Sequence, residues 1–281
     1  MIFSTMNHDR HPRPPPLGSS ALAVVTSLVA ARRSGRPASA LAQAVCSDDE
    51  AYAIQDAVAS ALGWFGDSPP KYWKSGGAAR DMALTHAALP PAGVRTAGQS
   101  LADLRWQQPA VEAEIALRLA REVTPEQAQR LSHADGPGLV DAMAVAIEIA
   151  DSRWQEGLQA PAALRLADQG SHGALVLGPW MRCRAQDWAR QRCELRFGAA
   201  PPVSANTGAY SLGDPLWLLP IWLRHATRGG RTVAAHSVVT TGSWVGAIPM
   251  PANAEVLVRF PGLGQVGLRA GRVEAALYEP D

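Results

Sequence analysis

Two largely apolar segments of the sequence carry acidic residues, and one of these residues lies where a folded chain has to bury it. Residues 109–119 read as a strand in which Val111 and Ile115 point to one side, while Glu112 and Glu114 point to the other. Residues 144–151 are almost entirely apolar and β-branched, which predicts a buried strand, yet Glu148 lies inside it. A buried carboxylate is costly unless it is paired or binds a cation. These three carboxylates therefore constrain both the fold and its chemistry.

A divalent cation shared by the three glutamates accounts for this pattern. Glu112 and Glu114 repel each other unless solvent or a cation separates them. A hard cation such as Mg²⁺ prefers oxygen ligands. Two simpler interpretations stay open, because the Glu-x-Glu strand can present a solvated acidic face, and Glu148 can form a buried ion pair with an arginine such as Arg153.

Lysine is almost absent from this chain. Of the 26 basic residues only Lys71 and Lys74 are lysines, which leaves 24 arginines. A lysine amine can change its protonation state near neutral pH when it is buried, whereas a guanidinium cannot. The bias favours a chemical role for Lys74, with an anchoring salt bridge as the alternative.

The charge balance and the hydropathy exclude two classes of protein. The formal net charge is +1, so no basic excess is present to bind nucleic acid. No apolar run approaches the ~18 residues of a spanning helix, which argues against a membrane protein.

Residues 21–31 resemble a signal-peptide core, and Ala-Ser-Ala at 38–40 resembles a cleavage site. Because Arg32 and Arg33 lie between the two, we expect a helix there instead.

Two further composition features bear on the protein's setting. The three cysteines, Cys46, Cys183 and Cys193, have no metal-type spacing and are too few for a disulfide scaffold. They favour a reducing compartment, and we expect a cytoplasmic protein. Charged residues make up only 18% of the chain and nine residues are Trp, which predicts buried subunit contacts and a homo-oligomer.

The order of elements predicts an α+β fold. Helices are expected at 21–33, at 48–62 after the Ser47–Glu50 capping box, after Thr124, and from Asp214 to Arg228. Strands are expected at 111–119, 142–151, 174–177, 193–197, 237–241, 255–260, 265–269 and 273–277, the last three as an antiparallel sheet or barrel wall. We expect a disordered Pro-rich tail at 1–18, a helical segment at 19–95 and a β-rich catalytic body at 96–281, with 19–281 as one structural unit.

Several segments, taken in order, resemble the 2-keto-4-pentenoate hydratases of the fumarylacetoacetate hydrolase superfamily. The segments are 73–76 (Trp-Lys-Ser-Gly), 112–116 (Glu-Ala-Glu-Ile-Ala) and 147–154, which begins Ile-Glu-Ile-Ala-Asp. Weaker matches follow at 167–171, 176–178, 213–216, 240–243 and 262–264. The resemblance covers roughly residues 20–269, and it rests on the ordered set rather than on one motif.

The resemblance implies a fold, a cofactor and a reaction. The fold would be a mixed β-roll, barrel-like, with helices packed outside and an N-terminal helical segment. Mg²⁺ or Mn²⁺ would bind Glu112, Glu114 and Glu148. The reaction would add water to a short 2-hydroxy-2,4-dienoic acid from aromatic-ring breakdown, giving a 4-hydroxy-2-keto acid.

The resemblance also assigns roles around the substrate. Lys74 would be the proton shuttle or a substrate-binding cation, with its pKa depressed by the neighbouring cation. Ser171 and Ser243 would hydrogen-bond the substrate. His172 is interpreted as a surface-loop histidine, and Asp103 is a candidate second acid–base group.

Three alternatives to the hydratase remain. A metal-dependent decarboxylase of a 2-keto-3-enedioate would need an extra cation for the second carboxylate, for which Lys71 and Arg80 are candidates. Hydrolysis of an acylpyruvate ranks below it, because residues 48–76 contain no histidine to activate water. A non-catalytic relative that binds keto acids is favoured by the altered residues after Lys74 and around Ser171.

Overall fold

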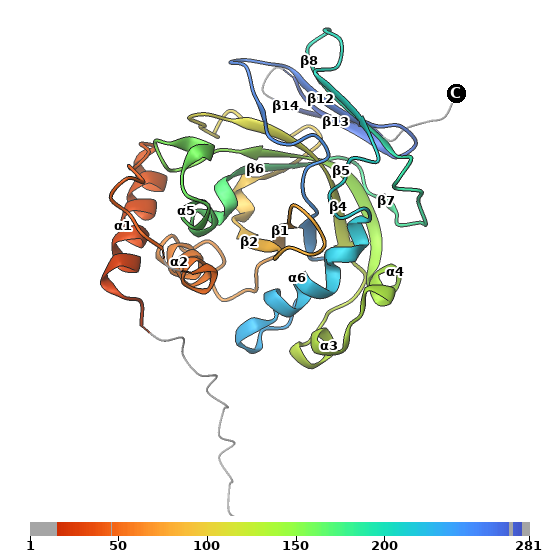
Figure 1. Cartoon of the computed structure of the whole chain (residues 1–281). Coiled ribbons are helices and arrows are strands. Elements are labelled where there is room, and N and C mark those ends of the chain that lie inside the picture. Colours follow the sequence, from red (N-terminus) through yellow and green to blue (C-terminus); the bar gives the residue numbers. More distant parts are fainter. Residues whose placement is uncertain (1–15, 46, 270–271, 277–281) are drawn as a thin grey trace, which may run out of the picture.

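The computed structural model describes residues 16–45, 47–269 and 272–276, and its chain forms two β-sheets with helices around them (Figure 1). The six α-helices of these residues are α1 Ser19–Ser34, α2 Asp48–Ala61, α3 Pro125–Arg130, α4 Gly136–Leu139, α5 Ala162–Ala167 and α6 Leu219–Ala226. Short 3₁₀ turns lie at η1 Pro91–Gly93, η2 His133–Asp135, η3 Gly157–Gln159, η4 Gln169–Ser171, η5 Pro215–Leu218 and η6 Arg228–Gly230. The α+β fold class is confirmed. The predicted tail falls at 1–18, of which residues 1–15 lie outside the described part.

The larger sheet has the strand order β2-β1-β10-β4-β5-β6-β3, with β11 paired to β4 and β7 paired to β5. Its strands are β1 Tyr72–Gly76, β2 Thr85–Leu89, β3 Val94–Thr96, β4 Ala110–Leu119, β5 Val140–Ala150, β6 His172–Leu177, β7 Met181–Arg182, β10 Val238–Thr240 and β11 Ile248–Pro249. β1 pairs with β10 and β3 with β6 in parallel, and the other pairs are antiparallel. The sheet curls around the interior of the molecule (Figure 1).

The second sheet is entirely antiparallel and has the order β14-β13-β12-β8-β9. Its strands are β8 Arg192–Phe197, β9 Ser204–Thr207, β12 Val256–Phe260, β13 Gly264–Arg269 and β14 Arg272–Ala276. It lies along the top of Figure 1, on the opposite side of the larger sheet from α2 and α6. The antiparallel sheet predicted from the last three strands is confirmed, although Leu277 lies outside the described residues.

Alternation along β4 and β5 decides which side chains form the core. Val111 and Ile115 of β4 and Ile147 of β5 are fully or almost fully buried, and they belong to one cluster with Val258 and Val266 of the second sheet. The even-numbered side chains of both strands face the other side of the larger sheet, as period-two geometry requires. The predicted division of residues 111–119 between two faces is therefore confirmed.

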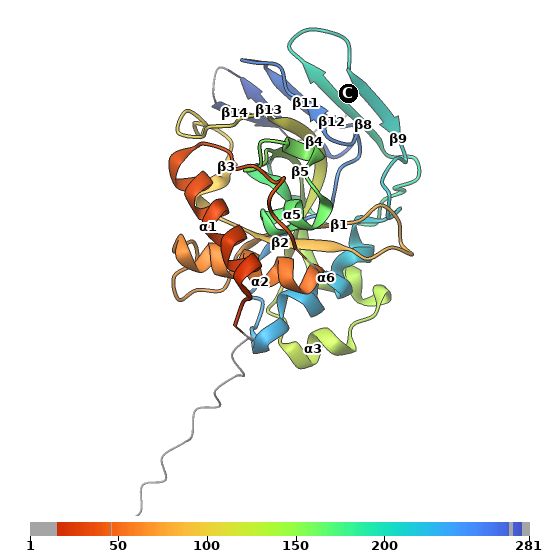
Figure 2. The ribbon, with the colours of Figure 1, turned by 60° about the vertical axis from the view of Figure 1, so that its left-hand side comes forward.

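The segment 19–95, predicted to be helical, contains three strands in addition to α1 and α2 (Figure 2). β1 and β2 belong to the same sheet as β4, so this sheet crosses the expected boundary at residue 95. These strands are short, and β2 is the Ala-containing sequence Thr-His-Ala-Ala-Leu, which has little intrinsic β preference. Pairing with distant strands imposes their conformation. Within the described residues, no helix is both long enough and apolar enough to cross a membrane.

The helix signals are largely confirmed. The Ser47 side chain accepts a hydrogen bond from the backbone N of Glu50 at 3.2 Å at the start of α2. Thr124 caps α3 with a complete capping box. The N-cap of α1 is Gly18, and the helix begins at Ser19, two residues before the expected start at residue 21. The segment after Asp214 forms η5 and then α6, which ends at Ala226.

Two histidines are packed between the helices and β2. The rings of His86 and His225 lie 4.4 Å apart, and Tyr52 of α2 lies 4.3 Å from His225. The hydroxyl of Ser75 is hydrogen-bonded to Nδ1 of His86 at 2.9 Å. Burial and the positive charge of Arg228 together lower the pKa of His86 to about 3.

The neutral His86 predicts a dependence of stability on acid. The unfolded chain protonates this histidine near pH 6.5 while the folded chain does not, so stability is lost as the pH falls below about 6.5. His86→Gln removes the titration and retains a polar partner for Ser75. Between pH 6 and pH 4, we expect the unfolding free energy of this variant to fall less steeply than that of the wild type. The difference should be about 1.4 kcal/mol per pH unit, measured by denaturant titration. Equal slopes, or the same flattening in the exposed control His236→Gln, would contradict this interpretation.

Candidate metal centre

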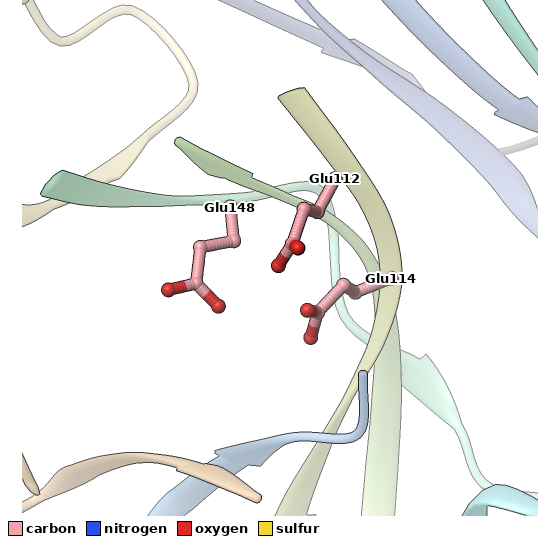
Figure 3. Close-up of side chains that lie close together, drawn as sticks. All are labelled: Glu112, Glu114 and Glu148. Atoms are coloured by element: carbon pink, nitrogen blue, oxygen red, sulfur yellow. The ribbon is translucent and has the colours of Figure 1, made fainter. Parts of the chain in front are cut away.

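Three glutamates converge on the face of the larger sheet that is turned away from the second sheet (Figure 3). In the pairing of β4 with β5, Glu112 lies directly opposite Glu148 and Glu114 lies opposite Ala146. One carboxylate oxygen from each glutamate can be chosen so that all three lie within 4.8 Å of one another. Glu148 is completely buried, Glu114 is 1% exposed and Glu112 is partly buried. The structure thus brings together the three acidic residues singled out in the sequence.

Burial and mutual repulsion dominate the electrostatics of this cluster. Burial, together with the charges of Glu148 and Glu112, raises the pKa of Glu114 to about 8. Burial also raises the pKa of Glu112, although Lys74 opposes the shift. For Glu148 the balance is reversed, because Lys74 and His172 outweigh burial and lower the pKa of its carboxyl group. Ionising all three carboxylates would therefore place more negative charge in the cluster than Lys74 neutralises.

Lys74 of β1 is the cationic partner of the cluster. Its Nζ donates to Oε1 of Glu148 at 2.6 Å and to the backbone oxygen of Gly170 at 3.2 Å, and its side chain is 20% exposed. Burial lowers the pKa of Lys74, but the charges of Glu148, Glu112 and Glu114 outweigh burial and raise it above the ordinary value. The depressed lysine pKa expected beside a bound cation stays a prediction, because these contacts are those of the side chains without a cation. The alternative pairing of Glu148 with Arg153 is wrong, since the Nε of Arg153 binds Asp168 at 2.9 Å.

His172 lies in the cluster, which corrects its interpretation as a surface-loop residue. The side chain is 1% exposed, and Nδ1 lies 3.1 Å from Oε1 of Glu148. The reason is that β6 begins at His172 and pairs antiparallel with β5, so the histidine starts a buried strand instead of ending a loop. Burial lowers the pKa of His172, so the ring is neutral at pH 7 and donates from Nδ1. The apolar run that follows Gly-Ser-His was the available sequence signal.

The two oxygens of Glu148 are used differently, and this difference bears on metal binding. Both Lys74 and His172 contact Oε1, while Oε2 is buried and has no hydrogen-bond partner among the described residues. An orphaned buried carboxylate oxygen beside two further buried carboxylates is an all-oxygen donor set of the kind that Mg²⁺ or Mn²⁺ prefers. The residues therefore fit the implied cation.

The two predicted serines are placed differently. Ser171 is buried beside His172, and its Oγ has no partner among the described residues. Ser243 follows Gly242, whose backbone N donates to Oε2 of Glu114 at 3.1 Å. Its own hydroxyl is engaged in a local turn, in which it donates to the backbone oxygen of Gly246 at 2.8 Å.

Other candidate residues lie away from the cluster or at its edge. Asp103 is 66% exposed on its side chain and pairs with Arg95 at 2.6 Å, which does not support a role as a second acid–base group. Lys71 is exposed, with its Nζ over the ring of Tyr72. Sequence reasoning missed Thr240 of β10, which is the direct strand partner of Lys74 and has a buried Oγ1 with no partner among the described residues.

Comparisons with known proteins agree on one superfamily. A family model described as fumarylacetoacetate (FAA) hydrolase C-terminal matches residues 78–269. The 2-keto-4-pentenoate hydratase 2 of Dechloromonas aromatica is 31% identical over 262 residues, which is 87% of this chain and 95% of that protein. The TodF product hydratase of Pseudomonas putida is 33% identical over 61% of this chain, and the match covers 63% of that protein's length.

Solved structures show the same fold. The 4-oxalocrotonate decarboxylase from Pseudomonas putida G7, complexed with calcium and acetate, superposes with a TM-score of 0.74 at 18% identity, covering 89% of this chain and 96% of that chain. A second structure of that protein, complexed with magnesium and adipate, gives a TM-score of 0.73 with the same identity and coverage. The agreement confirms the expected mixed β-roll architecture.

The crowding of carboxylates predicts that removing one of them stabilises the chain in the absence of divalent cations. Glu114 gains a proton in the folded state, so its contribution to stability is lost as the pH rises from about 4.5 towards 8. Glu114→Gln has no proton to take up, so its stability does not fall in this way as the pH rises. Its side-chain amide oxygen can still accept the hydrogen bond from the backbone N of Gly242. We expect EDTA-treated Glu114→Gln to be more stable than wild type by on the order of 1–3 kcal/mol at pH 7, with an advantage that grows with pH.

Denaturant titration at pH 5, 6, 7 and 8 in EDTA measures this difference. Glu122→Gln, a change of the same type at an exposed position, serves as the control and should leave stability unchanged at every pH. A Glu114→Gln variant that is less stable than wild type at pH 7 and pH 8 would show that the cluster is not under electrostatic strain.

Proposed function

The chain belongs to the fumarylacetoacetate hydrolase family, and we propose that it is a metal-dependent hydratase that acts on a 2-hydroxy-2,4-dienoate of the 2-keto-4-pentenoate type. The observation that carries the proposal is the buried group of three glutamates with Lys74 on one oxygen of Glu148. The hydratase relatives support the choice of reaction, at 31% and 33% identity. The product would be a 4-hydroxy-2-keto acid, and the setting would be the breakdown of aromatic compounds.

Glu112, Glu114 and Glu148 would hold the cation, Mg²⁺ or Mn²⁺. When bound, a divalent cation supplies Lewis-acid stabilisation of the negative charge that develops at the 2-oxygen of a keto acid. The glutamates keep that charge centre on the rigid paired strands β4 and β5. The solved relative complexed with magnesium and adipate is consistent with this assignment.

The hydration needs a proton carrier, and Lys74 is the residue placed to act as one. During the reaction C4 gains the hydroxyl of water, while the enol proton and the second proton of water end on carbon. Lys74 carries a proton at neutral pH, because the neighbouring carboxylates raise its pKa. This is the proton that Lys74 would transfer as charge moves from the substrate's oxygen onto its carbon chain.

Two serines would contact the substrate. The buried Oγ of Ser171 has no partner among the described residues and lies next to His172, so a substrate oxygen would satisfy it. Ser243 is the second candidate, and its hydroxyl has to leave the hydrogen bond with Gly246 to make such a contact.

We further propose that the protein is a cytoplasmic homo-oligomer. Its few cysteines and its low content of charged residues, 18% of the chain, support this proposal.

A decarboxylase of a 2-keto-3-enedioate is the second candidate function. The high structural similarity to 4-oxalocrotonate decarboxylase favours it at the level of the fold. Arg80 favours it at the level of residues, since its Nε is held by the backbone oxygen of Leu212 at 2.6 Å and its guanidinium lies 5.4 Å from the ring of Trp217. No carboxylate of the described residues pairs with this exposed cation, so a second substrate carboxylate could do so.

The first prediction from this proposal concerns the substrate. Freshly generated 2-hydroxypenta-2,4-dienoate should lose its dienol absorbance when the protein is added with Mg²⁺ or Mn²⁺, and EDTA should stop the loss. The product should be 4-hydroxy-2-ketopentanoate. No loss of absorbance in protein that binds Mn²⁺ would leave the metal site standing and discard the substrate. Turnover of a 2-keto-3-enedioate with release of CO₂ would then establish the decarboxylase, and binding without turnover of either acid would indicate a non-catalytic relative.

The second prediction separates metal binding from proton transfer. Lys74→Met removes the proton carrier but none of the carboxylates, so we expect kcat to fall roughly 100-fold or more while Mn²⁺ still binds. Lys71→Met is the matched control, because Lys71 is the other lysine of the chain and is exposed. Full activity of Lys74→Met would reduce Lys74 to a structural cation.

A further inference from the structure

The turn between α5 and β6 has an unusual backbone. Three consecutive residues have positive φ angles, namely Gln169 at 50°, Gly170 at 61° and Ser171 at 59°. Two of these residues carry a Cβ, which makes the left-handed region unfavourable for them. Such a conformation persists only when surrounding contacts hold it in place. The turn must therefore have a specific anchor.

That anchor is the carboxylate of Asp168, which precedes the turn and is completely buried. Its oxygens accept hydrogen bonds from Nη2 of Arg32 at 2.9 Å, from the backbone N and Nε of Arg153 at 2.8 and 2.9 Å, and from the hydroxyl of Ser152 at 3.4 Å. Two guanidinium groups from distant parts of the chain thus bind one carboxylate. Arg32 belongs to α1, and Arg153 follows β5. We refer to Arg32, Asp168 and Arg153 as the clamp.

The clamp also reaches the turn itself. Nη2 of Arg32 donates to Oε1 of Gln169 at 3.1 Å, and Nη2 of Arg153 donates to the backbone oxygen of His172 at 2.8 Å. The backbone N of Ser171 donates to the backbone oxygen of Asp168 at 2.9 Å, which closes the turn. Each end of the segment 169–172 is therefore hydrogen-bonded to one arginine, Gln169 to Arg32 and His172 to Arg153.

The other side of the turn faces the glutamate cluster. The backbone oxygen of Gly170 accepts a hydrogen bond from Lys74 at 3.2 Å, and His172 contacts Oε1 of Glu148 at 3.1 Å. A Cβ on Gly170 would lie 3.4 Å from Cδ of Lys74, so the backbone passes close to the lysine side chain. A small shift of the turn would move both partners of Glu148.

We propose that Asp168 and Arg32 are positioning residues, which place Lys74 and His172 on one oxygen of Glu148 through the turn 169–171. This inference rests on the proposed function of the same site. It extends the site to α1, because Arg32 lies outside the residues 78–269 that match the family model. An ion pair that only docks α1 onto the sheet would contribute to stability but would leave the chemistry of Lys74 and Glu148 unchanged.

Arg32→Met tests the clamp, and Arg33→Met is the matched control. Arg33 is the next residue of α1 and is exposed, and within the described residues its side chain donates to the backbone oxygen of Ala61 at 3.1 Å. We expect Arg32→Met to lower kcat for the dienoate tenfold or more, with KM changed less than threefold. The Mn²⁺ dissociation constant, measured by electron paramagnetic resonance, should rise threefold or more. Arg33→Met should match wild type in all three quantities.

A conservative variant and a milder one keep the test decisive if Arg32→Met does not fold. Arg32→Lys retains a positive charge opposite Asp168, so kcat and Mn²⁺ affinity should return to within threefold of wild type. Gln169→Gly adopts a positive φ without strain but loses the side-chain contacts to Arg32 and to the backbone oxygen of Gln55, and it should lower kcat.

The outcomes separate this inference from the function on which it rests. If wild type binds Mn²⁺ and folded Arg32→Met and Gln169→Gly keep wild-type kcat and Mn²⁺ affinity, the clamp only stabilises the fold and the inference is overturned. If wild type binds no Mn²⁺, the metal site itself is wrong and the role of the clamp is overturned with it. If wild type binds Mn²⁺ but does not hydrate the dienoate, the Mn²⁺ affinities of the variants still decide the question.

Discussion

The direct pairing of Glu112 with Glu148 across β4 and β5 is the constraint on which the rest of the site depends. Strand register places two carboxylates opposite each other, and the pleat adds Glu114 on the same face two residues further along. Burying three such groups is unfavourable, because desolvation and mutual repulsion both oppose their ionisation. The pKa of about 8 for Glu114 expresses that cost. This cost falls where a divalent cation bound to the three carboxylates would offset it.

The partners of the cluster come from distant segments and contribute in an unequal way. Lys74 arrives on β1 and His172 on β6, and both contact the same oxygen of Glu148. The backbone N of Gly242 contacts Glu114 instead. Because the protein's own donors gather on Oε1 of Glu148, its Oε2 is left buried and unpaired within the described residues. The asymmetry separates the oxygens available to a cation from the oxygen that orients the lysine.

The turn 169–171 connects two helices, α1 and α2, to the glutamate cluster. α1 is joined to the turn by Arg32, and α2 is joined to it by the hydrogen bond from Gln169 to the backbone oxygen of Gln55 at 3.3 Å. The N-terminal segment is therefore packed against the site and contacts its supporting residues.

The sequence by itself determined what depends on short periodicities and on residue type. Alternation in 111–119 assigned the two faces of β4, the apolar run around Glu148 identified a buried carboxylate, and the scarcity of lysine singled out Lys74. Pairing between separate segments was settled when the chain folded. The folded sheet selected Lys74 rather than Arg153 as the partner of Glu148, and it buried His172 by starting β6 at that residue. It also made strands of 72–76 and 85–89, where local preference is weak. Lys74 and Glu148 are 74 positions apart, and a contact over such a separation leaves no periodic trace in either segment, so it is fixed only when the sheet assembles.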